Sequence, residues 1–134
     1  MDAVLNGHSC EYAPSVLPPS AINPPKIVER GLALTRRINR AIFAAGLNPA
    51  DPAKCPAPKV GNTLNLNTLL MMSSGCLALT LECSVSYDIP KRAGAKRRPK
   101  VCYTFEQLME PPFIALGEML RDGLERPFID RAKW

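Results

Sequence analysis

The order of apolar and polar residues predicts two strands in this chain. Residues 3–6 read Ala-Val-Leu-Asn and predict a short strand that runs into Gly7 and His8. The stretch 76–83 is almost continuously apolar and too short for a buried helix. It therefore predicts a strand that is covered on both faces, as strands are in α/β sheets.

Two segments between these strands repeat their apolar residues at helical spacing. From Pro24 and Pro25 to Gly46 the apolar positions recur about every 3.6 residues, with Asn23 as the expected N-cap. Four arginines mark the face of this helix that we expect in water: Arg30, Arg36, Arg37 and Arg40. A shorter helix is expected to begin at Asn65 or Asn67 and to end at residues 73–75, Ser-Ser-Gly.

A last helix is predicted from Thr104, because Thr104 to Gln107 match a capping box. Pro111 and Pro112 predict that this helix kinks or splits in two, and Gly123 is a candidate for its end. Its expected apolar face consists of Leu108, Met109, Ile114, Leu116, Met119, Leu120 and Leu124.

Together these elements predict an α/β fold with one domain's worth of sequence in 134 residues. Proline-rich residues 13–25 and 48–60 are expected to be irregular connections, and residues 125–134 a tail. No apolar run reaches the roughly 18 residues that a membrane-spanning helix needs, so we expect none.

The positive charge of the chain is concentrated in one segment. The net charge is +5, from 17 Lys and Arg against 12 Asp and Glu. Residues 91–100 hold six of these bases among Gly and Pro, which predicts an exposed basic loop. Such a loop can bind phosphates, but it is more commonly just solvated, and alone it does not indicate a nucleic-acid-binding protein.

The cysteines indicate neither a structural zinc site nor a disulfide framework. Five of them are widely spaced and form no Cys-x-x-Cys pair. A reducing compartment such as the cytoplasm fits this usage, although the sequence does not settle the localisation.

Glu82 and His8 are the candidate chemical residues. Glu82 ends an apolar strand, where an ionised carboxylate is costly unless it is paired, solvated or bound. In open α/β sheets, ligands and reacting groups gather at the carboxyl ends of strands, and His8 follows the first strand in the same way. Each residue also has an ordinary interpretation: Glu82 turns to water or pairs with an arginine, and His8 is structural or merely exposed.

The sequence around these two residues resembles one enzyme family. His8-Ser9 follows a strand, and residues 74–82 read Ser-Gly-Cys-Leu-Ala-Leu-Thr-Leu-Glu after an Asn-Leu-Asn-Thr helix at 65–68. These segments and the terminal Thr-Phe-Glu-Gln-Leu helix resemble the zinc carboxypeptidases, the carboxypeptidase A-like metallopeptidases. That family places its third zinc ligand in a His-Ser pair and its catalytic glutamate at the end of a Ser-Gly-x-x-x-x-Thr-x-Glu strand.

The resemblance implies a zinc-dependent peptide hydrolase with a mixed sheet flanked by helices. His8 would be a zinc ligand and Glu82 the general base acting on zinc-bound water. The His-x-x-Glu motif that supplies the family's first two ligands is not in this chain, and no tyrosine or arginine can be matched to the substrate-binding ones. We therefore expect residues 1–134 to be the C-terminal portion of a catalytic domain that is incomplete on its N-terminal side and inactive alone.

Two other classes of function remain open. One is a non-catalytic α/β module that docks an anionic partner through the basic loop 91–100, and the other is an inactive remnant of an enzyme. The zinc hypothesis differs from both, because it requires His8 and Glu82 to reach a common point in the fold. A structure that places them on opposite faces of the sheet would contradict it.

Overall fold

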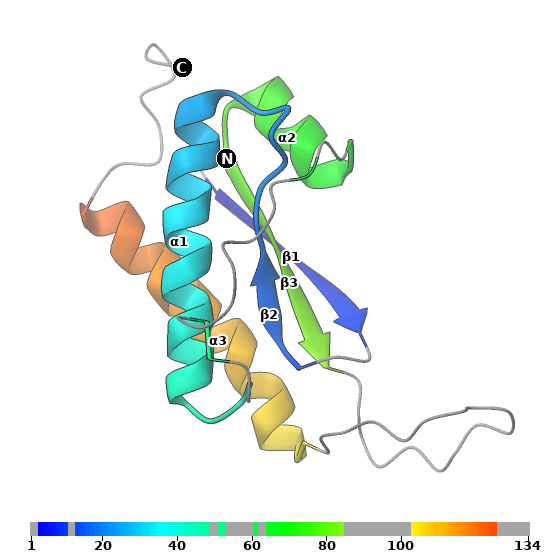
Figure 1. The fold of residues 1–134 in the computed structure, drawn as a ribbon, viewed down its shortest axis with the longest axis vertical. Coiled ribbons are helices and arrows are strands. Elements are labelled where there is room, and N and C mark those ends of the chain that lie inside the picture. Colours follow the sequence, from blue (N-terminus) through cyan, green and yellow to red (C-terminus); the bar gives the residue numbers. More distant parts are fainter. Residues whose placement is uncertain are drawn as a thin grey trace, which may run out of the picture.

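The computed structural model describes residues 3–10, 13–48, 51–52, 61, 64–84 and 103–125. In this part of the chain, a three-stranded mixed sheet is flanked by three helices, which confirms the predicted α/β class (Figure 1). The elements run in the order β1 (Ala3–Cys10), β2 (Ser15–Leu17), α1 (Pro25–Ala44), α2 (Leu66–Ser74), β3 (Leu77–Ser84) and α3 (Phe105–Glu125).

Strand β3 is the centre of the sheet. It pairs with β1 in parallel and with β2 in antiparallel orientation, giving the order β1-β3-β2. Both of its faces are covered as predicted, since Leu77, Leu79 and Leu81 are buried and so are Ala78 and Thr80 between them.

The two faces of β3 are covered by different helices. Gly31 of α1 packs close to Leu77, whereas residues of α2 line a pocket with Ala78 and Thr80. Since successive side chains of a strand point to opposite faces, α1 and α2 lie on opposite sides of the sheet. Helix α3 runs beside α1 (Figure 1).

The outer edge of β2 is bound by a side chain of α1. Asn39 Oδ1 accepts a hydrogen bond from the Val16 N–H at 2.7 Å, and Asn39 Nδ2 donates to the Val16 carbonyl at 2.9 Å. Asn39 thus replaces a further strand on this edge. Because this three-residue strand depends on α1 for part of its bonding, its own sequence predicted only an irregular connection.

Helix α1 differs at its start from the predicted cap. Pro24 occupies the N-cap position without a side-chain cap bond, and Asn23 Nδ2 instead donates to the Ser20 carbonyl at 3.0 Å. The end is as predicted, because Gly46 follows the helix with φ of 75°. This left-handed conformation favours glycine.

Two of the four arginines that were expected in water pair with α3 instead. Arg30 Nε lies 2.9 Å from Asp122 Oδ2, and this carboxylate is buried with 1% of its side chain exposed. Arg37 pairs with Glu118 and Glu125. Arg36 and Arg40 are exposed as expected. The arginines of α1 therefore help to fix α3 beside it, which no local pattern reveals.

The caps of α2 and α3 follow the sequence. Asn65 Oδ1 accepts from the Thr68 N–H at 2.9 Å, and Gly75 ends α2 in the left-handed conformation. At α3, Thr104 N–H donates to Gln107 Oε1 at 3.0 Å and Gln107 N–H donates to Thr104 Oγ1 at 3.3 Å, a reciprocal capping box. Bonds from its own backbone N–H and from Thr104 hold the pKa of Glu106 below its ordinary value.

Helix α3 differs from the expectations in its continuity, in its end and in the side that it buries. Of the two alternatives at Pro111 and Pro112, a kink or a split, the split does not occur, and the helix continues past its expected end at Gly123 to Glu125. Of the expected apolar face only Met119 is buried, while the buried side consists of Pro111, Ala115, Met119 and Asp122. The ion pairs with α1 orient this side inward, so most of the large apolar residues face water.

The hydrogen bonds between β2 and Asn39 of α1 lead to a prediction about the stability of the fold. Asn39→Ala leaves the N–H and carbonyl of Val16 without these partners, so we expect the free energy of unfolding to fall by about 2 kcal/mol in urea denaturation. Asn39→Asp keeps the acceptor and loses the donor, and it should also destabilise the protein. Arg36→Ala on the exposed face of α1 is the control, and an equal loss there would contradict the interpretation.

Candidate functional site

The parallel pairing of β1 with β3 brings His8 and Glu82 together. The two residues are direct register partners, and His8 Nδ1 lies 3.9 Å from Glu82 Oε1. Both side chains therefore leave the same face of the sheet. The juxtaposition that the zinc hypothesis requires is present, although it does not by itself assign a role to either residue.

Both side chains are accessible to water, His8 more than Glu82. The exposed fraction is 57% for the imidazole side chain and 20% for the carboxylate side chain. Glu82 thus escapes the cost of full burial at the end of its apolar strand, because it meets both solvent and a potentially cationic partner. A group that is to exchange protons with a substrate or with water needs such access.

Asn6 contacts the other nitrogen of the His8 ring. Asn6 Nδ2 lies 3.3 Å from His8 Nε2, two residues along the same strand. When the amide donates this bond, Nε2 is the acceptor and the ring hydrogen is on Nδ1, toward Glu82. Asn6 can therefore select the tautomer and the ring orientation of His8.

Polar residues continue across this face of the sheet. Ser15 of β2 is the register partner of Glu82 on the side opposite to His8, so His8, Glu82 and Ser15 form one row. In the next row Asn6 is the register partner of Thr80. Our sequence interpretation did not include Asn6 or Ser15. The spacing Asn6-x-His8 matches Thr80-x-Glu82, and this period of two was the available signal.

Helix α2 is tied to the same face by a buried hydrogen bond. Asn67 Nδ2 donates to Thr80 Oγ1 at 2.6 Å, and Asn67 is 4% exposed. Its Oδ1 is buried and has no hydrogen-bond partner among the residues that the structure describes. Asn67, predicted as a possible cap, thus connects the helix to the strand, and Asn65 provides the cap.

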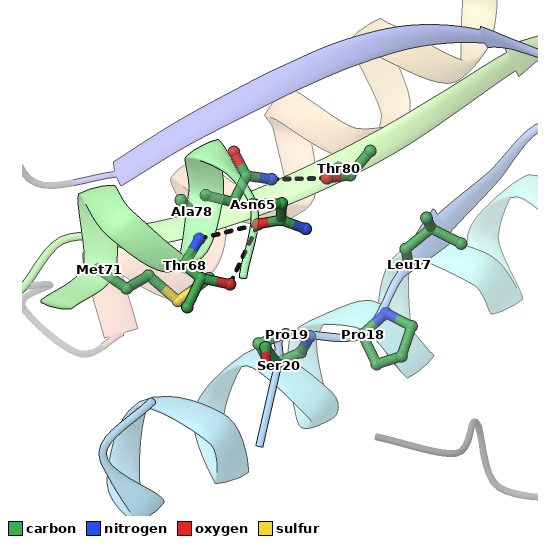
Figure 2. Close-up of a pocket in the computed structure, with 10 residues that line it drawn as sticks. Leu17, Pro18, Pro19, Ser20, Asn65, Thr68, Met71, Ala78 and Thr80 are labelled. Atoms are coloured by element: carbon green, nitrogen blue, oxygen red, sulfur yellow. Dashed lines mark hydrogen bonds between the residues drawn. The ribbon is translucent and has the colours of Figure 1, made fainter. Parts of the chain in front are cut away.

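A small pocket lies beside this bond (Figure 2). Pro18, Pro19 and Ser20 form one side of it, and Thr68 and Met71 of α2 form another. It has room for about one water molecule, which could donate to the free oxygen of Asn67. The pocket is too small for a substrate, so the open surface around His8 and Glu82 is the better candidate.

The described residues supply part of a zinc site at most. They contain no group of three His, Cys, Asp or Glu that could hold a metal ion. His8 offers one imidazole beside a carboxylate, and this donor chemistry suits zinc. A catalytic zinc site takes three protein ligands, so a complete one requires ligands from outside this set.

Other predicted features lie outside the described residues. These are the basic loop 91–100 and, beyond Glu125, the tail 125–134, so the structure does not bear on the docking of an anionic partner. Within the described part of the chain, no helix combines the length and the apolar character needed to cross a membrane, in line with the expectation.

Comparison of this chain with known proteins found no relative. No family model matches the chain, and searches of curated proteins and of solved structures also return no match. The geometry of the site and the resemblance of its motifs are therefore the basis for a functional proposal.

The bond between α2 and β3 can be tested by a matched pair of variants. Thr80→Val removes the acceptor while keeping the shape, so the buried Asn67 Nδ2 loses its hydrogen-bond acceptor and the free energy of unfolding should fall by about 1–3 kcal/mol. Thr80→Ser keeps the hydroxyl and should cost less. In a double-mutant cycle, Asn67→Leu with Thr80→Val should cost less than the sum of the single changes, and strict additivity would contradict the coupling.

Proposed function

We propose that this chain carries part of the site of a zinc-dependent peptide hydrolase of the metallocarboxypeptidase type. The observation that supports it most directly is the pairing of His8 with Glu82, at 3.9 Å, on a water-accessible face of the sheet. The motifs around both residues resemble zinc carboxypeptidases, and those motifs indicate peptides or peptide-like amides as substrates.

Glu82 is the general base in this proposal. Its carboxylate is partly exposed and lies two residues before the end of the central strand, which fixes its backbone through pairing on both sides. From there it can take a proton from a water molecule that attacks a carbonyl carbon, and can return it to the leaving amine. Ser15 and Asn6 are the polar neighbours on the same face.

His8 is the proposed metal ligand. Zinc, when bound, would lower the pKa of a water molecule and polarise the carbonyl group of the substrate. Zinc at Nδ1 requires the ring hydrogen on Nε2, so the Asn6 amide, 3.3 Å from Nε2, would turn its Oδ1 to accept that hydrogen and would hold Nδ1 toward the common point with Glu82. The remaining zinc ligands would come from residues outside this chain, so the chain alone should be a weak metal binder.

Weak zinc binding at His8 is the first expected result. His8 is the only histidine in the sequence, so its imidazole signals in an NMR spectrum are unambiguous. Titration with zinc should shift these signals with a dissociation constant between about 10 µM and 1 mM, far weaker than in a complete site. Glu82→Gln should leave the shift in place, because this residue is not the proposed ligand.

Two outcomes would contradict this assignment. His8 signals that do not move while zinc binds elsewhere, for example at cysteines, would exclude His8 as a ligand. Stoichiometric zinc that is retained through purification of the 134-residue protein would show that the chain holds a complete site of another kind.

The role of Glu82 can be tested by supplying zinc as a chelate with a bidentate amine such as bipyridine, which stands in for missing ligands. We expect no hydrolysis of a chromogenic N-acylated dipeptide with zinc salt alone. With the chelate, we expect slow hydrolysis that drops at least tenfold in Glu82→Gln, because a positioned general base contributes roughly 10²–10⁴-fold. Glu29→Gln on the exposed surface of α1 is the matched control. Equal hydrolysis rates in the wild-type protein and in Glu82→Gln would contradict the assignment of Glu82 as the general base.

A further inference from the structure

The outward side of α3 carries a continuous apolar stripe. Its members are spaced by four, four, three, four and four residues, close to the 3.6-residue repeat of a helix, so they share one face. The stripe consists of Phe105, Met109, Phe113, Leu116, Leu120 and Leu124, and each is exposed, from 43% for Met109 to 88% for Leu124. The stripe lies opposite the side that Ala115 and Asp122 bury against the body of the protein.

The spacing of this stripe is the same in both directions along the helix. Its centre falls between Phe113 and Leu116, with Met109 and Leu120 next on either side and Phe105 and Leu124 at the ends. When a second copy of α3 lies antiparallel across this centre, each stripe residue faces a stripe residue of the other copy. Two of the three kinds of contact then pair a phenylalanine with a leucine. Such self-complementarity is what a two-fold interface requires.

Charges on one flank of the stripe favour the antiparallel orientation. Glu110 and Arg121 are eleven residues apart, about three full turns, so they lie on the same side of α3. In the antiparallel pair, Arg121 lies opposite the segment between Glu106 and Glu110 of the other copy. Measured along the helix axis, it is about 3 Å from each of them. Symmetry repeats this contact. Arg121 is 65% exposed and binds Glu118 of its own chain at 3.0 Å, which leaves other guanidinium donors free to reach across.

A parallel pair would lose this charge match. The two-fold axis would then run along the helices and bring the flank with Glu110 and Arg121 against the opposite flank, where Leu108 and Pro112 lie.

Gly117 lies near the centre of the stripe on the charged flank, and a Cβ there would meet nothing within 4 Å in its own chain. A glycine inside a helix costs stability, and at the crossing point it allows a second helix to come close.

From these features we infer that the protein forms a symmetric dimer through the outer face of α3, with the two helices antiparallel. The large apolar side chains of the stripe expose several hundred Å² per copy, the order that one side of a standard interface buries, roughly 800 Å². This inference does not depend on the proposed zinc chemistry, and either can fail without the other.

Sedimentation of the full 134-residue chain over a range of concentrations tests the dimer. We expect a monomer–dimer equilibrium with a dissociation constant in the micromolar range. Leu120→Glu should weaken it at least about a hundredfold, since symmetry buries two carboxylates against apolar side chains. Leu66→Glu, at a similarly exposed position on α2, is the matched control and should leave the dissociation constant unchanged.

The orientation is tested by exchanging charges. Arg121→Glu alone places acids opposite acids, and Glu110→Arg alone places bases opposite bases, so each variant should dimerise several-fold more weakly than the wild-type protein. A mixture of the two variants restores opposite charges at both contacts, and it should form heterodimers more tightly than either variant pairs with itself. A parallel dimer predicts no such gain.

Several outcomes would overturn the inference. A chain that stays monomeric at several hundred micromolar excludes the dimer. A dimer that survives Leu120→Glu but is lost in Leu66→Glu places the interface on α2, and a mixture without preference for heterodimers removes the antiparallel orientation. Circular dichroism checks folding, and Leu124→Glu, at the most exposed position of the stripe, replaces Leu120→Glu if that variant unfolds.

Discussion

The register between β1 and β3 is the constraint on which the rest of the structure depends. It aligns His8 with Glu82 and Asn6 with Thr80, and so gathers the polar side chains on one face. A slip of one residue would send His8 to the opposite face, where the leucines of β3 pack against α1. The opposite side of β1 supports this register, because Ala3 and Leu5 are half-buried there against the core.

The sequence predicted well those elements whose determinants are local. The continuous apolar run of β3, the Asn65 cap of α2 and the capping box at Thr104 each lie within a few residues, and all are found. The proximity of His8 and Glu82 was expected from motif resemblance, and parallel pairing produces it. Asn6 and Ser15 were missed because their role depends on which strands become neighbours.

Features that depend on contacts between distant segments were not predictable in this way. Strand β2 has only three residues and relies on Asn39 of α1 for its outer edge. Arg30 and Arg37 look like solvent-facing charges until Asp122 and Glu118 are placed beside them. Together with the burial of Ala115 and Met119 in the core, these ion pairs set how α3 is rotated about its axis. They direct a side with small and charged residues inward, and they leave the larger apolar residues of the helix outside.

The pairing of Ala3 with Leu77 joins residues that are separated by more than half of the chain. The segment between them holds β2, α1 and α2, so a large loop must close before this contact contributes to stability. The helices form through local bonds, whereas the β2–β3 pair closes a loop that is nearly as long. The candidate site therefore depends on a long-range contact, and His8 reaches Glu82 only when the loop between β1 and β3 has closed.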